Sequence, residues 1–267
     1  MPSNYTADDA RAYERLMGRW SAALAKSFID FAGIEAGDRV LDVGCGTGSL
    51  ALALAARPEP ATIVGVDIAV PYVEYAASRS TDPRLSFRAE DATQLNWPPG
   101  TFDRSLSLLA LNFMSDPARA LAAMRRVTRG GGGVAAAVWD FQGGLVYQRI
   151  FWDTAAAFDP EADRARGRHY SSPLTGPDEL AHAFRSSGLQ HVAVCSLTIR
   201  MEYSDFDDYW APIAQAQGPV GDYVKSLATD RLELLAAAVR RAYLAGGPDG
   251  PRSMAATAWA ARGVVPD

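Results

Sequence analysis

Cysteine, histidine and clustered basic residues are scarce in this sequence. Its 267 residues include two cysteines and three histidines. Cys45 and Cys195 stand in unrelated sequence contexts, and neither belongs to a Cys/His cluster with the spacing of metal ligands. This scarcity argues against a metal centre and favours a reducing compartment, so we expect no metal ion and a cytoplasmic location.

The sequence also lacks a run of lysine and arginine. Its 26 basic and 31 acidic residues give a formal net charge of -5, and without a basic cluster nucleic acid is not the expected partner. The longest apolar stretch, Leu106 to Met114, is too short to span a bilayer, and the N-terminal residues do not resemble an export signal. We therefore expect neither a nucleic-acid nor a membrane partner, with a monomer and a homodimer both open.

What the sequence does contain is an alternation of short apolar strands and amphipathic helices. Apolar residues make up 48% of the chain, as in an ordinary folded protein. Because strand, helix and strand in succession imply parallel pairing, we expect a parallel sheet. The predicted strands of the first half are 39–43, 62–67, 85–90, 102–111 and 134–139, and the predicted helices are 6–32, 49–56, 71–79 and one from the cap at Ser115-Asp116-Pro117 to Arg129. The last of these helices is expected to stop at a turn of four glycines, Gly130 to Gly133.

The pattern changes after Asp140. We expect a helix over 146–158, a polar arginine-rich stretch over 161–170, a helix from about Thr175, and strands over 191–201 and 253–260. The segment 205–244 between these two strands is predicted to be a helical insertion. The expected organisation is thus an N-terminal helical cover, residues 1–36, followed by one α/β domain, residues 37–267.

The clearest motif is VLDVGCGTG, residues Val40 to Gly48. Alternate glycines remove Cβ atoms where a chain must bend sharply and a ligand must lie against it, and a loop between a strand and a helix lies at the ligand-binding edge of such a sheet. A dinucleotide fingerprint would have a glycine where Ser49 stands. Asp42 would repel a pyrophosphate, but it suits an ammonium group or backbone N–H donors.

This motif resembles the first motif of class I S-adenosylmethionine-dependent methyltransferases, of the bacterial small-molecule type. The resemblance implies a doubly wound, seven-stranded, mostly parallel α/β sheet whose last strand is antiparallel. It also implies S-adenosylmethionine as the cofactor and S-adenosylhomocysteine as the product. The cofactor would lie against Asp42 and the loop residues Gly44, Cys45, Gly46 and Gly48.

Further segments match the family in register. Asp67, followed by Ile68, resembles the acidic residue that accepts hydrogen bonds from both ribose hydroxyls. Asp91 resembles the residue that accepts from the adenine amino group, with Ala92 supplying a backbone contact, although Asp91 is also a plausible helix N-cap. The backbone at Leu109 and Ala110 would lie along the methionine part.

The segment YERLMGRWS ahead of the glycine motif resembles one found in many bacterial relatives. There Arg19 would pair with the carboxylate of the cofactor, because a guanidinium suits a carboxylate. Tyr13 or Trp20 would cover the methionine end. The spacing of Tyr13, Leu16 and Trp20 equally fits a helix face packed in the core, so both interpretations stay open.

The expected reaction is in-line methyl transfer to a small-molecule acceptor, in which alignment and exclusion of water supply much of the rate. His169 is the candidate catalytic base, whereas His182 and His191 fit surface or packing roles. Seven aromatic residues of the helical segments are candidates for an acceptor pocket or for core packing: Tyr147, Phe151, Trp152, Phe158, Tyr209, Trp210 and Tyr223. The alternatives are an NAD(P)-dependent oxidoreductase and a binding module that holds S-adenosylmethionine without turnover.

Overall fold

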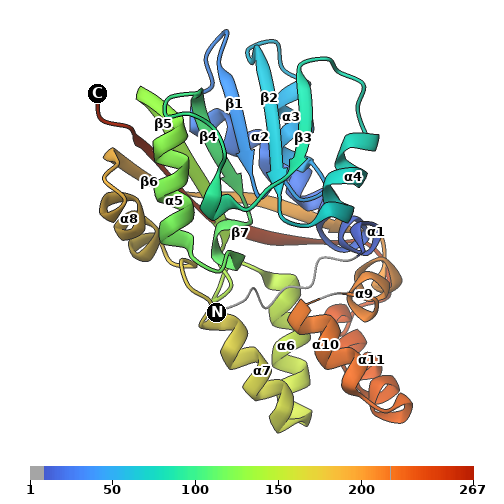
Figure 1. Cartoon of the computed structure of the whole chain (residues 1–267). Helices are drawn as coiled ribbons and strands as arrows, with labels where there is room; N and C mark the ends of the chain where they lie inside the picture. Colours follow the sequence, from blue (N-terminus) through green and yellow to red (C-terminus); the bar gives the residue numbers. More distant parts are fainter. Residues whose placement is uncertain (1–8, 217) are drawn as a thin grey trace.

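A computed structural model describes residues 9–216 and 218–267, and its centre is one seven-stranded sheet (Figure 1). The order of the strands is β3-β2-β1-β4-β5-β7-β6. Their bounds are β1 Arg39–Val43, β2 Thr62–Asp67, β3 Leu85–Ala89, β4 Phe102–Leu108, β5 Thr128–Trp139, β6 Gln190–Tyr203 and β7 Arg252–Val264. The predicted doubly wound α/β sheet is confirmed.

The first five strands run parallel, so their carboxyl ends meet at one edge of the sheet. β7 lies antiparallel between β5 and β6, which confirms the predicted orientation of the last strand. The order of the parallel strands reverses beside β1, whose neighbours are β2 and β4. Ligands of open α/β sheets bind at such a reversal, and the glycine motif follows β1 directly.

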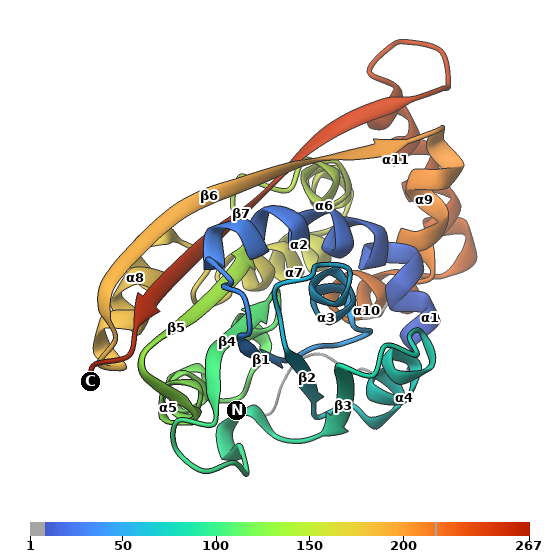
Figure 2. The same cartoon turned by 90° about the horizontal axis from the view of Figure 1, so that it is seen from above.

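Helices cover both faces of the sheet (Figure 2). One core contains Leu24 and Phe28 from α2 and Leu50 from α3, and the other contains Leu121 from α5 and Phe184 from α8. The bounds of the helices that flank the sheet are α1 Ala10–Tyr13, η1 Glu14–Gly18, α2 Arg19–Ala32, α3 Ser49–Ala55, α4 Val70–Ser78, η2 Ala92–Gln94, η3 Leu111–Phe113, α5 Pro117–Val127 and α8 Pro177–Ser186.

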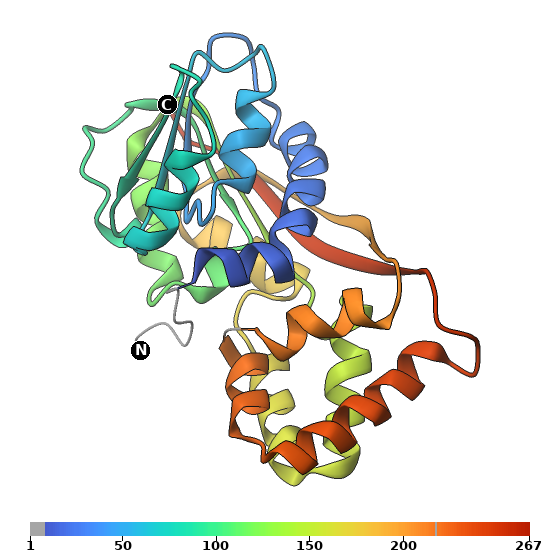
Figure 3. The ribbon, with the colours of Figure 1, turned by 90° about the vertical axis from the view of Figure 1, so that its right-hand side faces the viewer.

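A further layer of helices lies beyond the carboxyl edge of the parallel strands (Figure 3). It consists of α6 Val146–Phe158 and α7 Pro160–Tyr170, which follow β5, and of α9 Phe206–Ala214, α10 Gly218–Ser226 and α11 Thr229–Leu244, which join β6 to β7. The term "helical layer" denotes these five helices below. None of the described helices is long and apolar enough to cross a membrane.

Several of the boundaries predicted for helices and strands were wrong. The polar arginine-rich stretch, for which no secondary structure was predicted, forms α7, because Asp159 caps its first turn by accepting from the N–H of Glu161 and Pro160 occupies the first position. The fourth strand ends at Leu108 and not at Leu111, since Leu109 takes a left-handed conformation with φ 61°. The last two strands, β6 and β7, are several residues longer than expected because they pair with each other along most of their length.

The four glycines were also misassigned. Gly130 to Gly133 belong to β5, which begins at Thr128, so α5 ends at Val127 and not at Arg129. The C-terminal backbone lies against the glycines, with hydrogen bonds from Gly131 N–H to the Val265 carbonyl and from Val265 N–H to Gly132. A strand edge therefore uses the glycines where a turn was predicted.

The first helix departs from the prediction as well. A π-helical turn, η1, separates α1 from α2, and the predicted start at residues 6–8 lies outside the described residues. Single π turns within helices are frequent at functional sites. This turn carries Met17, one of the residues that line the cavity described below.

The two faces of the sheet give a direct test of the packing. Phe184→Ala should lower the free energy of unfolding by about 3 to 5 kcal/mol, because the side chain is fully buried and its removal leaves a cavity. Phe158→Ala is the matched control: its side chain is 55% exposed, and the change should stay within about 0.5 kcal/mol. Urea unfolding of the two variants measures both, and equal losses would contradict the assigned core.

Candidate active site

A cavity of about 480 Å³ lies between the carboxyl edge of the sheet and the helical layer. Loops that follow the first four strands line one end of it, and α6, α7, α9 and α10 contribute to the other end. Every predicted cofactor residue except Arg19 and Gly48 is among its lining residues: Asp42, Gly44, Cys45, Gly46, Asp67, Ile68, Asp91, Ala92, Leu109 and Ala110.

The glycine bend is closely packed against the loop after β4. Gly44 has φ 74°, and a Cβ atom built on it would lie 2.4 Å from the Cβ of Ala110. The N–H groups of Gly44 and Cys45 both donate to the carbonyl of Val66 in β2, at 2.8 and 2.9 Å. Gly44 is therefore required both by its backbone conformation and by its neighbour. Gly48 belongs to the same loop but does not line the cavity.

Asp67, at the end of β2, ties two loops together. Its Oδ2 accepts from Gly46 N–H and its Oδ1 from Ala69 N–H, both at 2.9 Å. Burial raises the pKa of its carboxyl, partly offset by these backbone hydrogen bonds. A carboxylate has about four acceptor positions, so two backbone bonds leave capacity for a ligand in the cavity. The neighbouring Ile68 is 73% exposed, as is unusual for a large apolar side chain.

Asp91 is a helix N-cap, as the alternative interpretation predicted, and it also lines the cavity. Its Oδ1 caps η2 by accepting from Thr93 N–H at 2.8 Å. Asp91, Ala92 and the preceding Glu90 all line the cavity. The ends of β1, β2 and β3 thus each bring an acidic side chain to the same end of the cavity.

Asp42 is the most perturbed of these acids. Burial raises the pKa of its carboxyl from 3.8 to about 8; a hydrogen bond from Ala51 N–H lowers it and the charge of Asp67 raises it further. Oδ2 receives the Ala51 bond at 3.1 Å, whereas the buried Oδ1 has no hydrogen-bond partner among the described residues. A buried acceptor without a partner is costly, and a cationic or N–H-bearing ligand would relieve that cost.

The loop after β4 contains a residue with a strained backbone conformation. Leu109 is a non-glycine residue with φ 61°, and its N–H donates to the carbonyl of Ala137 in β5 at 2.7 Å. Such conformations cost free energy and cluster where a ligand is held. The strain places Leu109 and Ala110 at the cavity, opposite the glycine bend.

Arg19 does not reach the cavity. Its guanidinium forms two hydrogen bonds to the carboxylate of Asp208 in α9, at 2.9 and 3.2 Å, and lies 4.2 Å from the centroid of the Trp20 ring. In this structure Arg19 is thus paired with Asp208, and its pairing with a cofactor carboxylate stays a prediction. The ion pair joins the N-terminal helix to the helical layer. Tyr13 does line the cavity, whereas Trp20 is buried against Tyr203.

The sequence did not reveal how the N-terminal helix is held over the glycine loop. The Thr47 hydroxyl donates to Glu14, a residue of the π turn. Arg79 completes the cluster: it lies 3.1 Å from the Glu14 carboxylate and donates to the Thr47 carbonyl at 2.9 Å. The first helix, the glycine loop and the end of α4 are thereby connected beside the cavity.

The other end of the cavity is apolar and aromatic. Of the seven aromatic candidates only Tyr147 and Phe151 line it, and the other five lie outside its lining. Residues that the sequence did not single out complete the wall: Met114, Trp139, Phe141, Gln148, Ile213 and Val220. No lysine or arginine of the described residues lines the cavity.

His169 lies at this end, on α7. Its side chain is buried, its Nε2 is 2.6 Å from Oε1 of Gln148, and its ring centroid is 4.4 Å from that of Phe141. Burial lowers the pKa of the imidazole to about 4, so the ring is uncharged near neutral pH. His182 and His191 do not line the cavity.

Comparison with known proteins identifies the family of this arrangement. Residues 40–132 match the family model described as a methyltransferase domain. The demethylmenaquinone methyltransferase of Roseiflexus castenholzii is 32% identical over 164 residues, which cover 58% of this chain and 68% of that protein. The chain belongs to the class I S-adenosylmethionine-dependent methyltransferases.

Two other comparisons show how far the likeness extends. The 27-O-demethylrifamycin SV methyltransferase of Amycolatopsis mediterranei is 30% identical over 163 residues, covering 59% of this chain and 56% of the relative. This chain spans about half the length, 47% and 56%, of two of the relatives that it matches. A solved phosphoethanolamine N-methyltransferase 2 of Haemonchus contortus, in complex with S-adenosyl-L-methionine, shares the fold with a TM-score of 0.61 at 17% identity, over 99% of this chain and 58% of that one.

The cavity has groups that fit the family's cofactor. The unpartnered Oδ1 of Asp42 suits the positive end of S-adenosylmethionine, and Asp67 and Asp91 offer acceptors for hydroxyl and amino groups. The close packing at Gly44 leaves no room for a side chain between the bend and Ala110. These features belong to this chain's own residues and agree with the family assignment.

The raised pKa of Asp42 gives a prediction about stability without ligand. A carboxyl whose pKa is raised on folding contributes stability that is complete below the unfolded pKa of 3.8 and is lost as the pH rises through about 8. Asp42→Asn cannot ionise, so between about pH 5 and pH 8.5 it should lose less stability than the parent protein.

Urea unfolding at the two pH values measures the difference, with the exposed Asp230→Asn as control. The control should follow the parent protein. An equal loss of stability in Asp42→Asn and the parent protein would show that Asp42 ionises at an ordinary pKa. That result would contradict the raised pKa of the buried carboxyl.

Proposed function

We propose that this protein transfers a methyl group from S-adenosylmethionine to a small-molecule acceptor. The observation that carries the proposal is a single cavity with acids and a glycine bend at one end and an apolar chamber at the other. The first end suits the adenosyl and amino groups of the cofactor, and the second suits an acceptor of limited size. Asp67 would bind the ribose, Asp91 the adenine edge, and Asp42 the ammonium end.

The protein would contribute to the reaction by aligning the two reactants and by excluding water from them. S-Adenosylmethionine supplies a methyl group on a positively charged sulfur, which becomes neutral on transfer. Residues of the helical layer and of the N-terminal helix line the apolar end of the cavity, and such apolar side chains would displace water around the reacting groups. Holding two reactants in line is worth about 7 to 11 kcal/mol of the barrier in well-aligned systems.

The proposal of a small acceptor rests on the size and lining of the chamber. The whole cavity is about 480 Å³, within the range of small-molecule sites. By their names, two relatives act on a demethylated rifamycin and on demethylmenaquinone, both small molecules. The expected cytoplasmic location, the absence of a nucleic-acid partner and the choice between monomer and homodimer stay predictions.

The NAD(P)-dependent alternative has less support. A dinucleotide carries a pyrophosphate, and the cavity presents Asp42, Asp67, Glu90 and Asp91 without a lining lysine or arginine among the described residues. These acids would repel the phosphates. A binding module that retains S-adenosylmethionine without turnover shares the cofactor end, and the chamber beside it is what favours an enzyme.

The choice of cofactor predicts a ligand-specific stabilisation. S-Adenosylhomocysteine at about 100 times its Kd should stabilise the folded state by about 2.7 kcal/mol and raise the Tm, because only the folded state binds it. NADH at the same concentration should leave the Tm unchanged. Thermal unfolding monitored by circular dichroism measures both, and stabilisation by NADH alone would favour the oxidoreductase.

The role of Asp67 gives a second prediction. Asp67→Ala should weaken binding of S-adenosylhomocysteine by about 1 kcal/mol or more, since hydrogen bonds to a charged acceptor contribute about 1.5 to 3 kcal/mol. Isothermal titration calorimetry measures the Kd, with Asp230→Ala on the surface of α11 as the control. A Kd equal to that of the parent protein would place Asp67 outside the site.

A further inference from the structure

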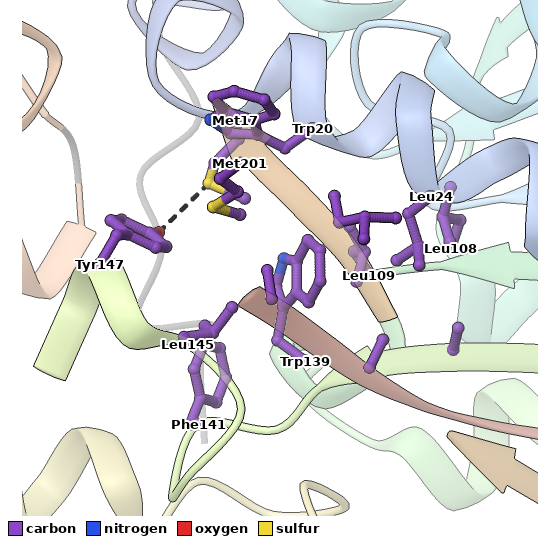
Figure 4. Packing of buried hydrophobic residues seen from close by; sticks show 14 of the residues in the cluster. Met17, Trp20, Leu24, Leu108, Leu109, Trp139, Phe141, Leu145, Tyr147 and Met201 are labelled. Carbon is purple, nitrogen blue, oxygen red and sulfur yellow. Dashed lines mark hydrogen bonds between the residues drawn. The ribbon is translucent and has the colours of Figure 1, made fainter. Parts of the chain in front are cut away.

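A chain of hydrogen bonds connects four side chains along the acceptor end of the cavity. Figure 4 shows its first member, the hydroxyl of Tyr147 donating to Sδ of Met17 at 3.3 Å. Nε2 of Gln148 donates to the same hydroxyl at 2.9 Å, and Oε1 of Gln148 lies 2.6 Å from Nε2 of His169. All four residues line the cavity, and they come from the π turn, α6 and α7.

The direction of each bond follows from the chemistry of its members. A thioether sulfur can only accept, so the hydrogen of the Tyr147 hydroxyl goes to Met17. The hydroxyl oxygen then accepts from the amide nitrogen of Gln148, which turns the amide oxygen toward the imidazole. Because that oxygen can only accept, Nε2 of His169 must carry a hydrogen. The lone pair of the neutral ring is therefore on Nδ1.

We propose that Gln148 is a positioning residue that fixes His169 with its lone pair on Nδ1, so that His169 takes the proton of a hydroxyl group on an uncharged, largely apolar acceptor. This inference rests on the proposed methyl transfer and names the acceptor class for it. No hydrogen bond joins Nδ1 to a described residue, so that nitrogen is available to a molecule in the cavity.

The charges around the cavity select against anionic acceptors. Its described lining includes four acidic side chains and no lysine or arginine, so the carboxylate or phosphate of an acceptor would meet no cationic side chain of the described residues. Residues 1–8 of the sequence contain no lysine or arginine either. Phe113, Phe141, Phe151 and Ile213 supply apolar surface for the body of the acceptor.

The proposed step is balanced in protons, electrons and charge. The O–H bond of the acceptor breaks and its proton goes to Nδ1, while an oxygen lone pair forms the new O–CH₃ bond. The electron pair of the broken S–CH₃ bond stays on sulfur. One positive charge therefore leaves the sulfur as one appears on the imidazole, and the charge in the cavity is conserved. The depressed pKa of His169 keeps the ring unprotonated beforehand.

The tautomer can be measured without knowing the acceptor. The chain has three histidines, so long-range ¹H–¹⁵N spectra of the imidazoles are simple to assign with His169→Phe as reference. The parent protein should show His169 as the Nε2–H tautomer. Gln148→Met, which keeps the size but cannot accept, should lose that preference, whereas Gln148→Glu, which keeps an acceptor, should retain it.

Gln142→Met is the matched control, because Gln142 is exposed and lies outside the cavity lining. An Nδ1–H tautomer in the parent protein, or a tautomer that does not change in Gln148→Met, would overturn the inference. This readout requires no methyl transfer. Failure of S-adenosylhomocysteine to bind would count against the proposed function, while a wrong tautomer with normal S-adenosylhomocysteine binding would count against this inference alone.

The acceptor class is tested with a matched pair of probes, 2-naphthol and 2-naphthoate, in the presence of S-adenosylhomocysteine. Titration calorimetry should show 2-naphthol binding at least tenfold more tightly than the anion. The preference should shrink in Val220→Lys, which adds a cation to the lining, and persist in Leu234→Lys on the exposed face of α11. Equal or tighter binding of 2-naphthoate, or no binding of 2-naphthol at millimolar concentration, contradicts the proposed class.

Discussion

The buried carboxyl of Asp42 beside the glycine bend is the constraint on which the rest of the site depends. Its position in β1 puts it on the face of the sheet that α2 and α3 cover, where one oxygen accepts from Ala51 N–H and the other has no described partner. Burying such a group is costly unless a ligand compensates for it. The left-handed bend at Gly44 brings that ligand close to the acid. Stability and binding are thus opposed in this loop, as is common where a fold stores strain at its site.

The helical layer supplies the apolar end of the cavity that begins at this cofactor-binding edge. Two separate parts of the chain build it, α6 with α7 and α9 to α11, and Arg19 links the N-terminal helix to it through Asp208. The cluster of Glu14, Thr47 and Arg79 fastens the same N-terminal helix to the glycine loop. The acceptor end is therefore assembled from segments that are distant in sequence, and its polar side chains are few. A few polar groups in an apolar chamber are what gives a small-molecule site its orientation and specificity.

Much of the fold could be predicted because it depends on local patterns. The alternation of strands and helices up to Trp139, and the acids at the ends of β1, β2 and β3, follow from short-range periodicity and loop chemistry. The ion pair of Arg19 could not be predicted, because its partner, Asp208, is 189 residues away and no local signal reveals it. Gln148 was missed for the same reason, since its partner His169 lies on another helix. The four glycines resembled a turn, and only pairing with the C-terminal backbone makes them a strand.

The central claim is that the acids and the glycine bend hold S-adenosylmethionine with its methyl group directed into the apolar chamber. A crystal structure with S-adenosylhomocysteine tests it most directly. The account predicts ribose hydroxyls within hydrogen-bond distance of Asp67 and a sulfur atom facing the end of the cavity that holds His169. A ligand bound elsewhere, or one whose sulfur faces away from that chamber, would contradict the account.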